Sequence, residues 1–374
     1  MKTFNQELWD SIPWVRVTDD LALPDIAALL RLQLDKDEGA SFAIDSRVVG
    51  EQITRQLAER KNQQKVGAEA FRLSASGNCL RRLALDFHGV PHNGFRGDGG
   101  SRIVFAYGDA VEAMVTLALT EACMHIPAIE LSDVLDEQRR VWLQVNMGDQ
   151  PWMSFRIPGS PDGDILSMRW MHGETPEQAW ENSREHPVRC VLEVKSASDF
   201  GFKKFREHGL TAKDRDGRPE GYYYQTQAYQ LARRQEGQDV EWSYVLMFGK
   251  GSSAKDAEIS PDFAPPVTSN GKPRKTFLVE NELLWRKLYP VVGRWIKRDE
   301  DVQADIVNRF QRVTLSKDPN EFPRIMEPKG KERKLSFPCD WCPHLFNCWP
   351  NAREVASRTG WFHTQTKTTI LAGD

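Results

Sequence analysis

The hydrophobic period of this sequence changes near residue 125, and that change limits the architectures open to the chain. Apolar residues recur at helical spacing before this point, and short alternating stretches separated by Pro, Gly and Asp follow it. Helices are predicted at 74–87, about 102–124, 221–235 and 281–298, and strands at 138–146, 152–158, 163–169, 189–196 and 240–249. This order predicts a mixed α/β fold without internal repeats, in which helices flank a central sheet.

Three segments lie outside this predicted core. Residues 1–70 are polar with helical spacing, and Asp19 and Asp20 precede DIAALLRLQL, so an N-terminal helical extension is expected. Residues 251–275 are rich in Ser, Pro, Gly and Lys, which predicts a surface loop inserted into the core. Residues 351–374 are expected to form a C-terminal tail.

The composition is that of an ordinary globular protein, and it excludes several classes. Hydrophobic residues make up 40% and charged residues 28% of the chain. The net charge of −3 argues against coating nucleic acid by bulk charge, although it leaves room for local phosphate contacts. The start of the chain has no apolar signal segment and no run is long enough to span a bilayer, so a cytoplasmic location without membrane contact is expected.

The segment VLEVKSAS, residues 191–198, carries the sharpest chemical signal. On a strand, Glu193 and Lys195 share one face while the apolar residues between and beside them point to the other. Upstream, the glycines and prolines of IPGSPDGDIL predict a turn that places Asp162 at a strand edge. Carboxylates of this kind hold Mg²⁺ or Mn²⁺, and a neighbouring lysine can offset charge that develops on a substrate. Asp164 is a rival ligand, because it shares a strand face with Asp162.

A Glu-x-Lys pair is also common on ordinary surface strands, and Asp162 alone reads equally as a turn acid. The combination with other features is more specific. Four motifs occur in one order: Gly108-x-x-x-Glu112, Gly159-x-x-Asp162, Glu193-x-Lys195 and Gln225-x-x-x-Tyr229. Together they resemble the RecB-like PD-(D/E)xK nucleases over roughly residues 74–350.

The resemblance implies a restriction-endonuclease-like core with a central mixed sheet, and a nuclease domain at 71–350. It implies a metal site formed by Glu112, Asp162, Glu193 and Val194. With glutamate at the first of these positions, the sequence resembles lambda exonuclease and its relatives, whereas many family members have histidine there. The catalytic set that it implies is Glu112, Asp162, Glu193, Lys195, Gln225 and Tyr229. In the family, the helix carrying the last two packs beside the site; core packing is the alternative for Tyr229 and for Tyr222.

Six cysteines in a chain of this size do not form a disulfide scaffold. Cys339, Cys342 and Cys348 have the spacing C-x2-C-x5-C, in which a turn can bring the first two thiolates onto one metal ion. His344 and Cys79 are the candidates for a fourth ligand. Cys123 falls in a predicted helix and Cys190 at a strand start, so both are expected to be packing residues.

One cysteine before the core and three after it resemble the iron–sulfur nucleases, which include CRISPR-associated RecB-like exonucleases and AddB-type subunits. The resemblance implies that Cys79 joins Cys339, Cys342 and Cys348 around a four-iron, four-sulfur (4Fe-4S) cluster that staples the ends of the core. A structural zinc ion is the alternative, because four thiolates suit it equally. Either group closes a long loop and so adds folding free energy.

The expected activity is metal-dependent hydrolysis of DNA, by an exonuclease rather than an endonuclease, in end processing, recombination or repair. The expected partner is DNA with a free end or a single strand, with a homo-oligomer or a recombination protein as further partners. Basic stretches at 202–218 and 327–334 are candidate phosphate contacts, or solvated faces. The alternatives are a DNA-end-binding or assembly module with a non-catalytic nuclease fold, and a zinc-stapled regulatory protein.

Overall fold

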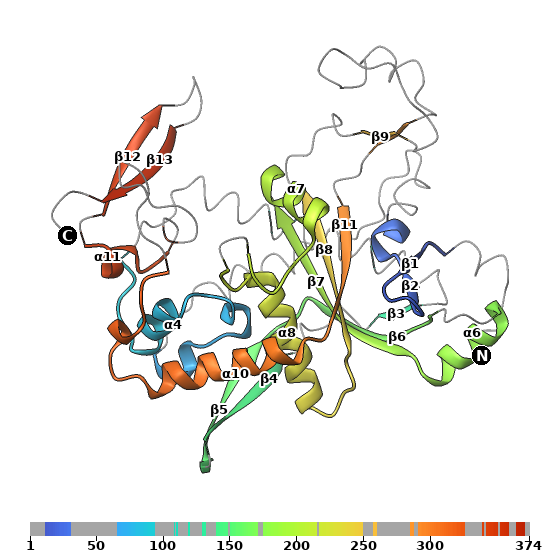
Figure 1. The fold of residues 1–374 in the computed structure, drawn as a ribbon, viewed down its shortest axis with the longest axis horizontal. Coiled ribbons are helices and arrows are strands. Elements are labelled where there is room, and N and C mark those ends of the chain that lie inside the picture. The colour runs from blue at the N-terminus through green and yellow to red at the C-terminus, as the bar shows by residue number, and fades with distance from the viewer. Residues whose placement is uncertain are drawn as a thin grey trace.

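A computed structural model describes most of the predicted core. The described residues are 12–30, 66–93, 108, 110, 119, 129–131, 140–148, 150–170, 175–214, 217–249, 257–259, 285–287, 291–325, 339, 342–350, 352–358 and 364–370. None of the helices in these ranges combines the length and the apolar character needed to cross a bilayer. The chain is a mixed α/β protein, as expected from the sequence (Figure 1).

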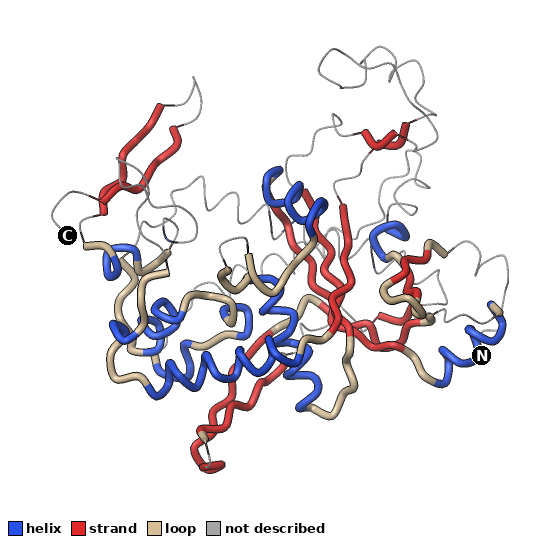
Figure 2. Tube along the Cα trace, in the orientation of Figure 1, coloured by secondary structure: helices blue, strands red, loops and turns tan. Residues whose placement is uncertain are grey.

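A five-stranded sheet lies at the centre, in the order β11-β8-β7-β6-β3. Its strands are β3 (Ile129–Leu131), β6 (Gly163–Met168), β7 (Val188–Ala197), β8 (Trp242–Gly249) and β11 (Val291–Lys297). β7 and β8 are parallel, whereas the other neighbours are antiparallel, so the sheet is mixed. In Figure 2 these strands form the red centre of the molecule.

Alternation along β7 gives the sheet two different faces. Cys190, Leu192 and Val194 are buried on one face, in a cluster that includes side chains of β6 and β8. Val191 points to the opposite face and joins a second cluster with the helices. Because Glu193 has the same parity as Val191, it also lies on the helix-covered face. The position of Cys190 confirms that it is a packing residue.

The helix α8 (Gly221–Gln235) covers this second face and packs against β7 and β8. Tyr224, Ala228 and Ala232 form its apolar contacts with the cluster, and α10 (Glu300–Leu315) packs on its outer side. The predicted helix at 221–235 is therefore confirmed at both ends. Its importance lies in the polar side chains that it directs toward the sheet, described below.

The prediction of a helix at 281–298 is wrong. The described part of that segment contains β10 (Trp285–Lys287) and β11, and β11 pairs with β8 along its whole length. Val291 and Trp295 pack on the Cys190 face of the sheet and Ile296 on the opposite face, and Pro290 interrupts a helix before the strand. The helix begins instead at Glu300, where Asp299 Oδ1 accepts a hydrogen bond from the Val302 backbone at 3.1 Å.

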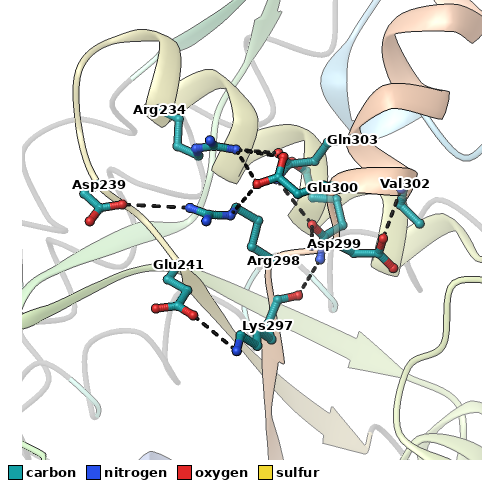
Figure 3. A network of polar contacts seen from close by, with 10 residues as sticks. Arg234, Asp239, Glu241, Lys297, Arg298, Asp299, Glu300, Val302 and Gln303 are labelled. Carbon is teal, nitrogen blue, oxygen red and sulfur yellow. Dashed lines mark hydrogen bonds and ion pairs between the residues drawn. The ribbon is translucent and has the colours of Figure 1, made fainter.

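Charged side chains surround this junction between β11, α8 and α10 (Figure 3). Arg298 lies 2.9 Å from Glu300, which also pairs with Arg234 at 3.2 Å. Such exposed pairs each contribute at most about 1 kcal/mol. The buried amide of Gln227 ties the elements together more directly, because it donates to the Lys297 carbonyl and accepts from the Asp299 backbone, both at 2.9 Å.

The described part of the N-terminal segment departs from the expected helical extension. It contains a hairpin of β1 (Trp14–Arg16) and β2 (Ala22–Pro24), and the helix begins only at residue 26. The segment packs on the Cys190 face of the sheet, where Ala27 donates a backbone hydrogen bond to the Tyr244 hydroxyl at 2.8 Å. Its apolar side chains therefore complete a core layer.

The remaining elements lie outside the central sheet. They are β4 (Val141–Met147), β5 (Gln150–Gly159), β9 (Ala257–Ile259), β12 (Ala352–Arg358), β13 (Thr364–Ile370), α4 (Leu80–Phe87), α6 (Pro176–Glu185), α7 (Asp199–His208), α11 (Leu345–Cys348) and the 3-10 turns Gly67–Ala70, Leu73–Ala75 and Pro319–Glu321. The predicted helix at 74–87 is shorter than expected, since α4 starts after a turn. Of the predicted helix at 102–124, only residues 108, 110 and 119 are described, all helical. Except for β9, the insertion at 251–275 lies outside the described residues.

Candidate active site and cysteine centre

The turn before β6 is clamped by its neighbours. A Cβ atom on Gly159 would lie 2.5 Å from Tyr229 Cε1 and 2.7 Å from Leu73 Cδ1, so any side chain here would displace a packed residue. Gly159 is therefore required by close approach. The clamp fixes the start of the turn that carries Asp162 to β7.

Asp162 connects this turn to the β7 strand. Its Oδ2 atom accepts a hydrogen bond from the Val194 backbone at 2.8 Å and one from Lys195 Nζ at 3.1 Å. The carboxylate thus lies beside the strand that carries the Glu-x-Lys pair, as the motif spacing predicts. The remaining oxygen, Oδ1, adds a further acceptor to the same carboxylate.

Glu193 is buried, with only 1% of the residue exposed. Its Oε2 atom lies 2.5 Å from Lys195 Nζ and accepts from Gln225 Nε2 at 3.3 Å. Burial raises the pKa of this carboxyl well above its usual value, although Lys195 opposes the shift. Among the described residues, Oε1 has no hydrogen-bond partner. A buried carboxylate oxygen in this state is costly unless a ligand satisfies it.

Lys195 lies between the two carboxylates. Besides Asp162 and Glu193, its Nζ atom donates to the Val194 carbonyl oxygen at 3.2 Å. The Lys195 side chain is 15% exposed, between the buried Glu193 side chain at 1% and the Asp162 side chain at 20%. Asp162, Glu193, Val194 and Lys195 are therefore brought together as the sequence predicts.

Gln225 and Tyr229 hold this arrangement from α8. One amide hydrogen of Gln225 reaches Glu193, and the other reaches the Tyr229 hydroxyl at 3.2 Å. Tyr229 in turn donates to the Ser160 carbonyl at 3.3 Å, and burial raises the pKa of its hydroxyl. Both residues orient the site from the neighbouring helix. Tyr222, by contrast, is 39% exposed.

Asp164, the rival metal ligand, has a different role. Arg233 on α8 donates hydrogen bonds to both of its carboxylate oxygens, from Nε at 3.1 Å and from Nη2. The arginine side chain is 1% exposed and the aspartate side chain 10%, so this is a buried bidentate pair. Asp162 is therefore the better candidate, because the acceptors of Asp164 are already satisfied.

The oxygen donors near Lys195 suit a hard divalent cation. The Asp162 carboxylate, the Glu193 carboxylate and the Val194 carbonyl all lie within 3.2 Å of one point, the position of Nζ. Oxygen ligands of this kind are those that Mg²⁺ and Mn²⁺ prefer, and Glu193 Oε1 leaves one buried acceptor unsatisfied. Glu112, the fourth residue of the expected metal set, lies outside the described residues.

The four cysteines of the second site line one small cavity, although Cys79 is remote from the others in sequence. The cavity is lined by Cys79, Cys339, Cys342, Cys348, Arg81, Arg324, Ile325, Leu345 and Trp349. Cys79 is the N-cap of α4, and its Sγ atom accepts from the Arg82 backbone at 3.3 Å. Burial raises the pKa of the Cys342 thiol to about 11. The four thiols are thus gathered in a setting where a cation would favour their deprotonation.

Cys79 lines the cavity with the other three cysteines, whereas both ring nitrogens of His344, the other candidate for the fourth ligand, have hydrogen-bond partners outside it. The residue is fully buried, and its Nδ1 atom lies 3.1 Å from the Asn347 Nδ2 donor. Asn347 is oriented by its own bonds to the Pro91 carbonyl and to Asn93. His344 therefore carries its proton on Nε2 and donates to Asp86 Oδ1 at 2.9 Å.

Asp86, His92 and His344 have side-chain atoms close enough to hold a metal ion, but hydrogen bonding explains their grouping. Both histidine Nε2 atoms approach the same Asp86 oxygen, within 3.0 Å. We call the Asp86–His344 contact the latch, because it joins α4, whose N-cap is Cys79, to the segment between Cys342 and Cys348. The latch could not be predicted from the sequence, in which only the position of His344 between two cysteines points to it.

Cys123 and the basic stretch at 327–334 lie outside the described residues. Within the stretch at 202–218, several charges have acidic neighbours. Arg218 pairs with Asp214 at 2.8 Å, and Lys203 lies 3.9 Å from Glu207. Lys204 is exposed on α7, the helix that directly follows β7. The α7 surface is therefore the part of this stretch that remains a candidate phosphate contact.

Comparisons with known proteins add little to this geometry. No family model matches the chain, and no curated protein matches it. Among solved structures, it is similar to a crystal structure of LHK-Exo in complex with dAMP, with 9% identity over 66% of this chain and 87% of that one, at a TM-score of 0.30. It is also similar to a phage related exonuclease from Haemophilus somnus 129PT, with 13% identity over 65% and 92%, at a TM-score of 0.29. Likenesses of this size carry no argument about function.

Proposed function

We propose that this chain is a metal-dependent deoxyribonuclease that hydrolyses phosphodiester bonds. The observation that carries the proposal is the grouping of Asp162, Glu193 and Lys195 around one point, with the Val194 carbonyl beside them. A buried carboxylate with an unsatisfied oxygen is expensive to maintain, and a structural role explains neither that oxygen nor the adjacent lysine. Metal-assisted hydrolysis gives all of these groups a function.

Asp162, Glu193 and the Val194 carbonyl would hold Mg²⁺ or Mn²⁺, with Glu112 as a further ligand. When bound, the ion lowers the pKa of a water molecule and polarises the phosphate. Lys195 is placed to donate hydrogen bonds to substrate oxygens as negative charge develops on them. Gln225 and Tyr229 keep the Glu193 carboxylate in one orientation, so little reorganisation is needed during the reaction.

The substrate is DNA with a free end or a single strand, and exonuclease action in end processing, recombination or repair is preferred over endonuclease action. These finer assignments extend the resemblance of the four motifs to the RecB-like nucleases. A homo-oligomer or a recombination protein is the proposed partner, in the cytoplasm of a bacterium or of a phage-infected cell. The exposed lysines of α7 are the proposed phosphate contacts, since that helix starts where β7 ends.

Cys79, Cys339, Cys342 and Cys348 would hold the second metal group, a 4Fe-4S cluster with zinc as the alternative. The shared cavity supports a four-thiolate site. The charged side chains among its described lining residues are Arg81 and Arg324, which would offset the net negative charge of either group with four thiolates. The position of the cysteines, on α4 and around α11, suits a staple between the two sides of the core.

A non-catalytic DNA-end-binding module is the second candidate function. It would use the same fold and the same cysteine centre, and the exposed lysines of α7 would serve it equally well. The complete set of Asp162, Glu193 and Lys195 argues against it, because a binding module has no need for a buried carboxylate beside a lysine. A zinc-stapled regulatory protein would leave that set unexplained as well.

The test is cleavage of end-labelled linear DNA and of circular DNA by anaerobically purified protein, with Mn²⁺, Mg²⁺ or a chelator. Cleavage should require the metal ion, and Glu193→Gln should slow it by at least about a hundredfold. The matched control is Glu241→Gln, which changes an acid whose side chain is 49% exposed and pairs with Lys297 at the surface. Equal rates for Glu193→Gln and wild type, or DNA binding without cleavage in any metal ion, would overturn the proposal.

A further inference from the structure

The Lys195 ammonium group occupies the centre of a three-oxygen cage. Its Nζ atom lies 2.5 Å from Glu193 Oε2, 3.1 Å from Asp162 Oδ2 and 3.2 Å from the Val194 carbonyl oxygen. These are the same three residues whose oxygens form the described part of the proposed metal set. The cage therefore already holds a cation, and that cation belongs to the chain.

A divalent ion and the ammonium group cannot share this position. Mg²⁺ binds oxygen at about 2.0–2.1 Å and Ca²⁺ at about 2.3–2.6 Å, so an ion on these oxygens would lie within contact distance of Nζ. Two cations at that separation also repel each other strongly in a partly buried site. An ion that binds the three oxygens now in contact with Nζ therefore displaces the lysine.

We propose that Lys195 is a built-in substitute for the metal ion: it neutralises the carboxylates in the metal-free protein and is displaced when a divalent cation binds. The inference rests on the proposed function only for the identity of the ligand oxygens. The displaced ammonium group is then available to the phosphate of a substrate. Metal binding thereby places the lysine in its catalytic position.

The surroundings determine which group moves. The β7 backbone pairs with β8 from Cys190 to Ala197 and with β6 as far as Leu192, and Asp162 is held by the Val194 amide. Glu193 is held by Gln225, which is itself anchored to Tyr229. Lys195 is attached through a flexible four-carbon chain, so its ammonium group has the most freedom to move away.

The substitution also explains how Glu193 is tolerated without metal. A carboxylate with 1% exposure would be strongly destabilised if nothing neutralised it. Lys195 supplies the opposite charge at 2.5 Å in the absence of the ion. When a divalent ion binds, it neutralises the Glu193 carboxylate in place of the lysine. The carboxylate therefore has an opposite charge beside it in both the metal-free and the metal-bound protein.

The first test measures the reactivity of the lysine in the full-length wild-type protein. A brief pulse of an amine-acetylating reagent is followed by peptide mass spectrometry, with and without Ca²⁺, whose binding is measured separately by calorimetry. Acetylation of Lys195 should rise at saturating Ca²⁺, whereas exposed Lys203 on α7 serves as the unchanged control. Unchanged or reduced acetylation of Lys195, or no saturable Ca²⁺ binding, would overturn the displacement.

The second test compares Mn²⁺ affinity in Lys195→Met and in the control Lys297→Met, a lysine with 57% of its side chain exposed, by calorimetry after circular dichroism has verified folding. Removing the competing ammonium group should lower the Kd for Mn²⁺ at least tenfold in Lys195→Met, with no change in the control. A weaker or equal affinity contradicts the inference. DNA cleavage is scored separately: an active nuclease with unchanged Lys195 acetylation overturns the displacement alone, and displacement without cleavage in any metal ion overturns the nuclease proposal alone.

Discussion

The two aspartates at the start of β6 should respond to mutation in opposite ways. Asp164→Ala removes one half of the buried pair with Arg233, whose side chain is 1% exposed. Breaking such a pair costs about 3–5 kcal/mol, because the remaining charge stays buried. Arg233 keeps a second partner in Glu236 at 2.9 Å, so we expect the lower end of this range, about 3 kcal/mol.

This loss should appear in thermal unfolding of the metal-free protein. With an unfolding entropy of about 2.1 cal/mol/K per residue, a chain of 374 residues loses about 1.3 °C for each kcal/mol, so the Tm of Asp164→Ala should fall by roughly 4 °C. Its affinity for Mn²⁺ at a temperature where it remains folded should be close to that of wild type. Asp162→Ala should show the reverse: a small change in Tm and loss of both Mn²⁺ binding and cleavage.

A double variant separates the lost pair from lost packing. Replacing both partners, as in Asp164→Leu with Arg233→Met, should recover most of the stability, since apolar replacements of a buried ion pair are often neutral or stabilising. An Asp164→Ala protein with the Tm of wild type and no Mn²⁺ binding would refute the assignment, and Asp164 would then be the metal ligand.

Three further outcomes are expected. Anaerobically purified protein should be brown and contain about four irons per chain. Cys79→Ser should lose the colour, whereas Cys190→Ser should keep it. One zinc ion and no iron per chain would contradict the cluster. His344→Gln should lower metal content of the cysteine centre, because the latch to Asp86 is lost, and wild-type content would show that the latch is dispensable. Burial raises the pKa of Glu220 above 4.5, so protonation of Glu220 stabilises the fold fully below that pH, and this contribution is lost as the pH rises through the folded-state pKa. The free energy of unfolding of Glu220→Gln in urea, relative to wild type, should therefore increase from pH 4.5 toward neutrality. A difference between the two proteins that does not change with pH would contradict this.

Much of the candidate active site was predictable because it depends on local patterns. Alternation along β7 places Glu193 and Lys195 on one face, and glycine-rich spacing places Asp162 at the next strand. The i, i+4 spacing of Gln225 and Tyr229 directs both toward the sheet. Each of these patterns lies within a few residues of the chain, although the contacts between them join residues more than 30 apart.

Other features were not predictable, since they depend on partners far apart in sequence. The pairing of Asp164 with Arg233 spans 69 residues, and no spacing rule separates it from the neighbouring Asp162. A helix was predicted at β11 from the sequence, but the segment forms a strand because it pairs with β8 at the edge of the sheet. The latch between Asp86 and His344 joins residues 258 apart.

The spacing of polar side chains along α8 restricts how the chain can vary in length. Gln225, Tyr229 and Arg233 stand four residues apart, about 6 Å along the helix axis for each step, and contact Glu193, Ser160 and Asp164 in turn. Inserting or deleting one residue within the helix would rotate the later side chains by about 100° and break their contacts together. The connection at 209–220 makes none of these three contacts. Homologues and engineered variants should therefore tolerate indels in that connection, whereas the interval from 225 to 233 should keep a constant length.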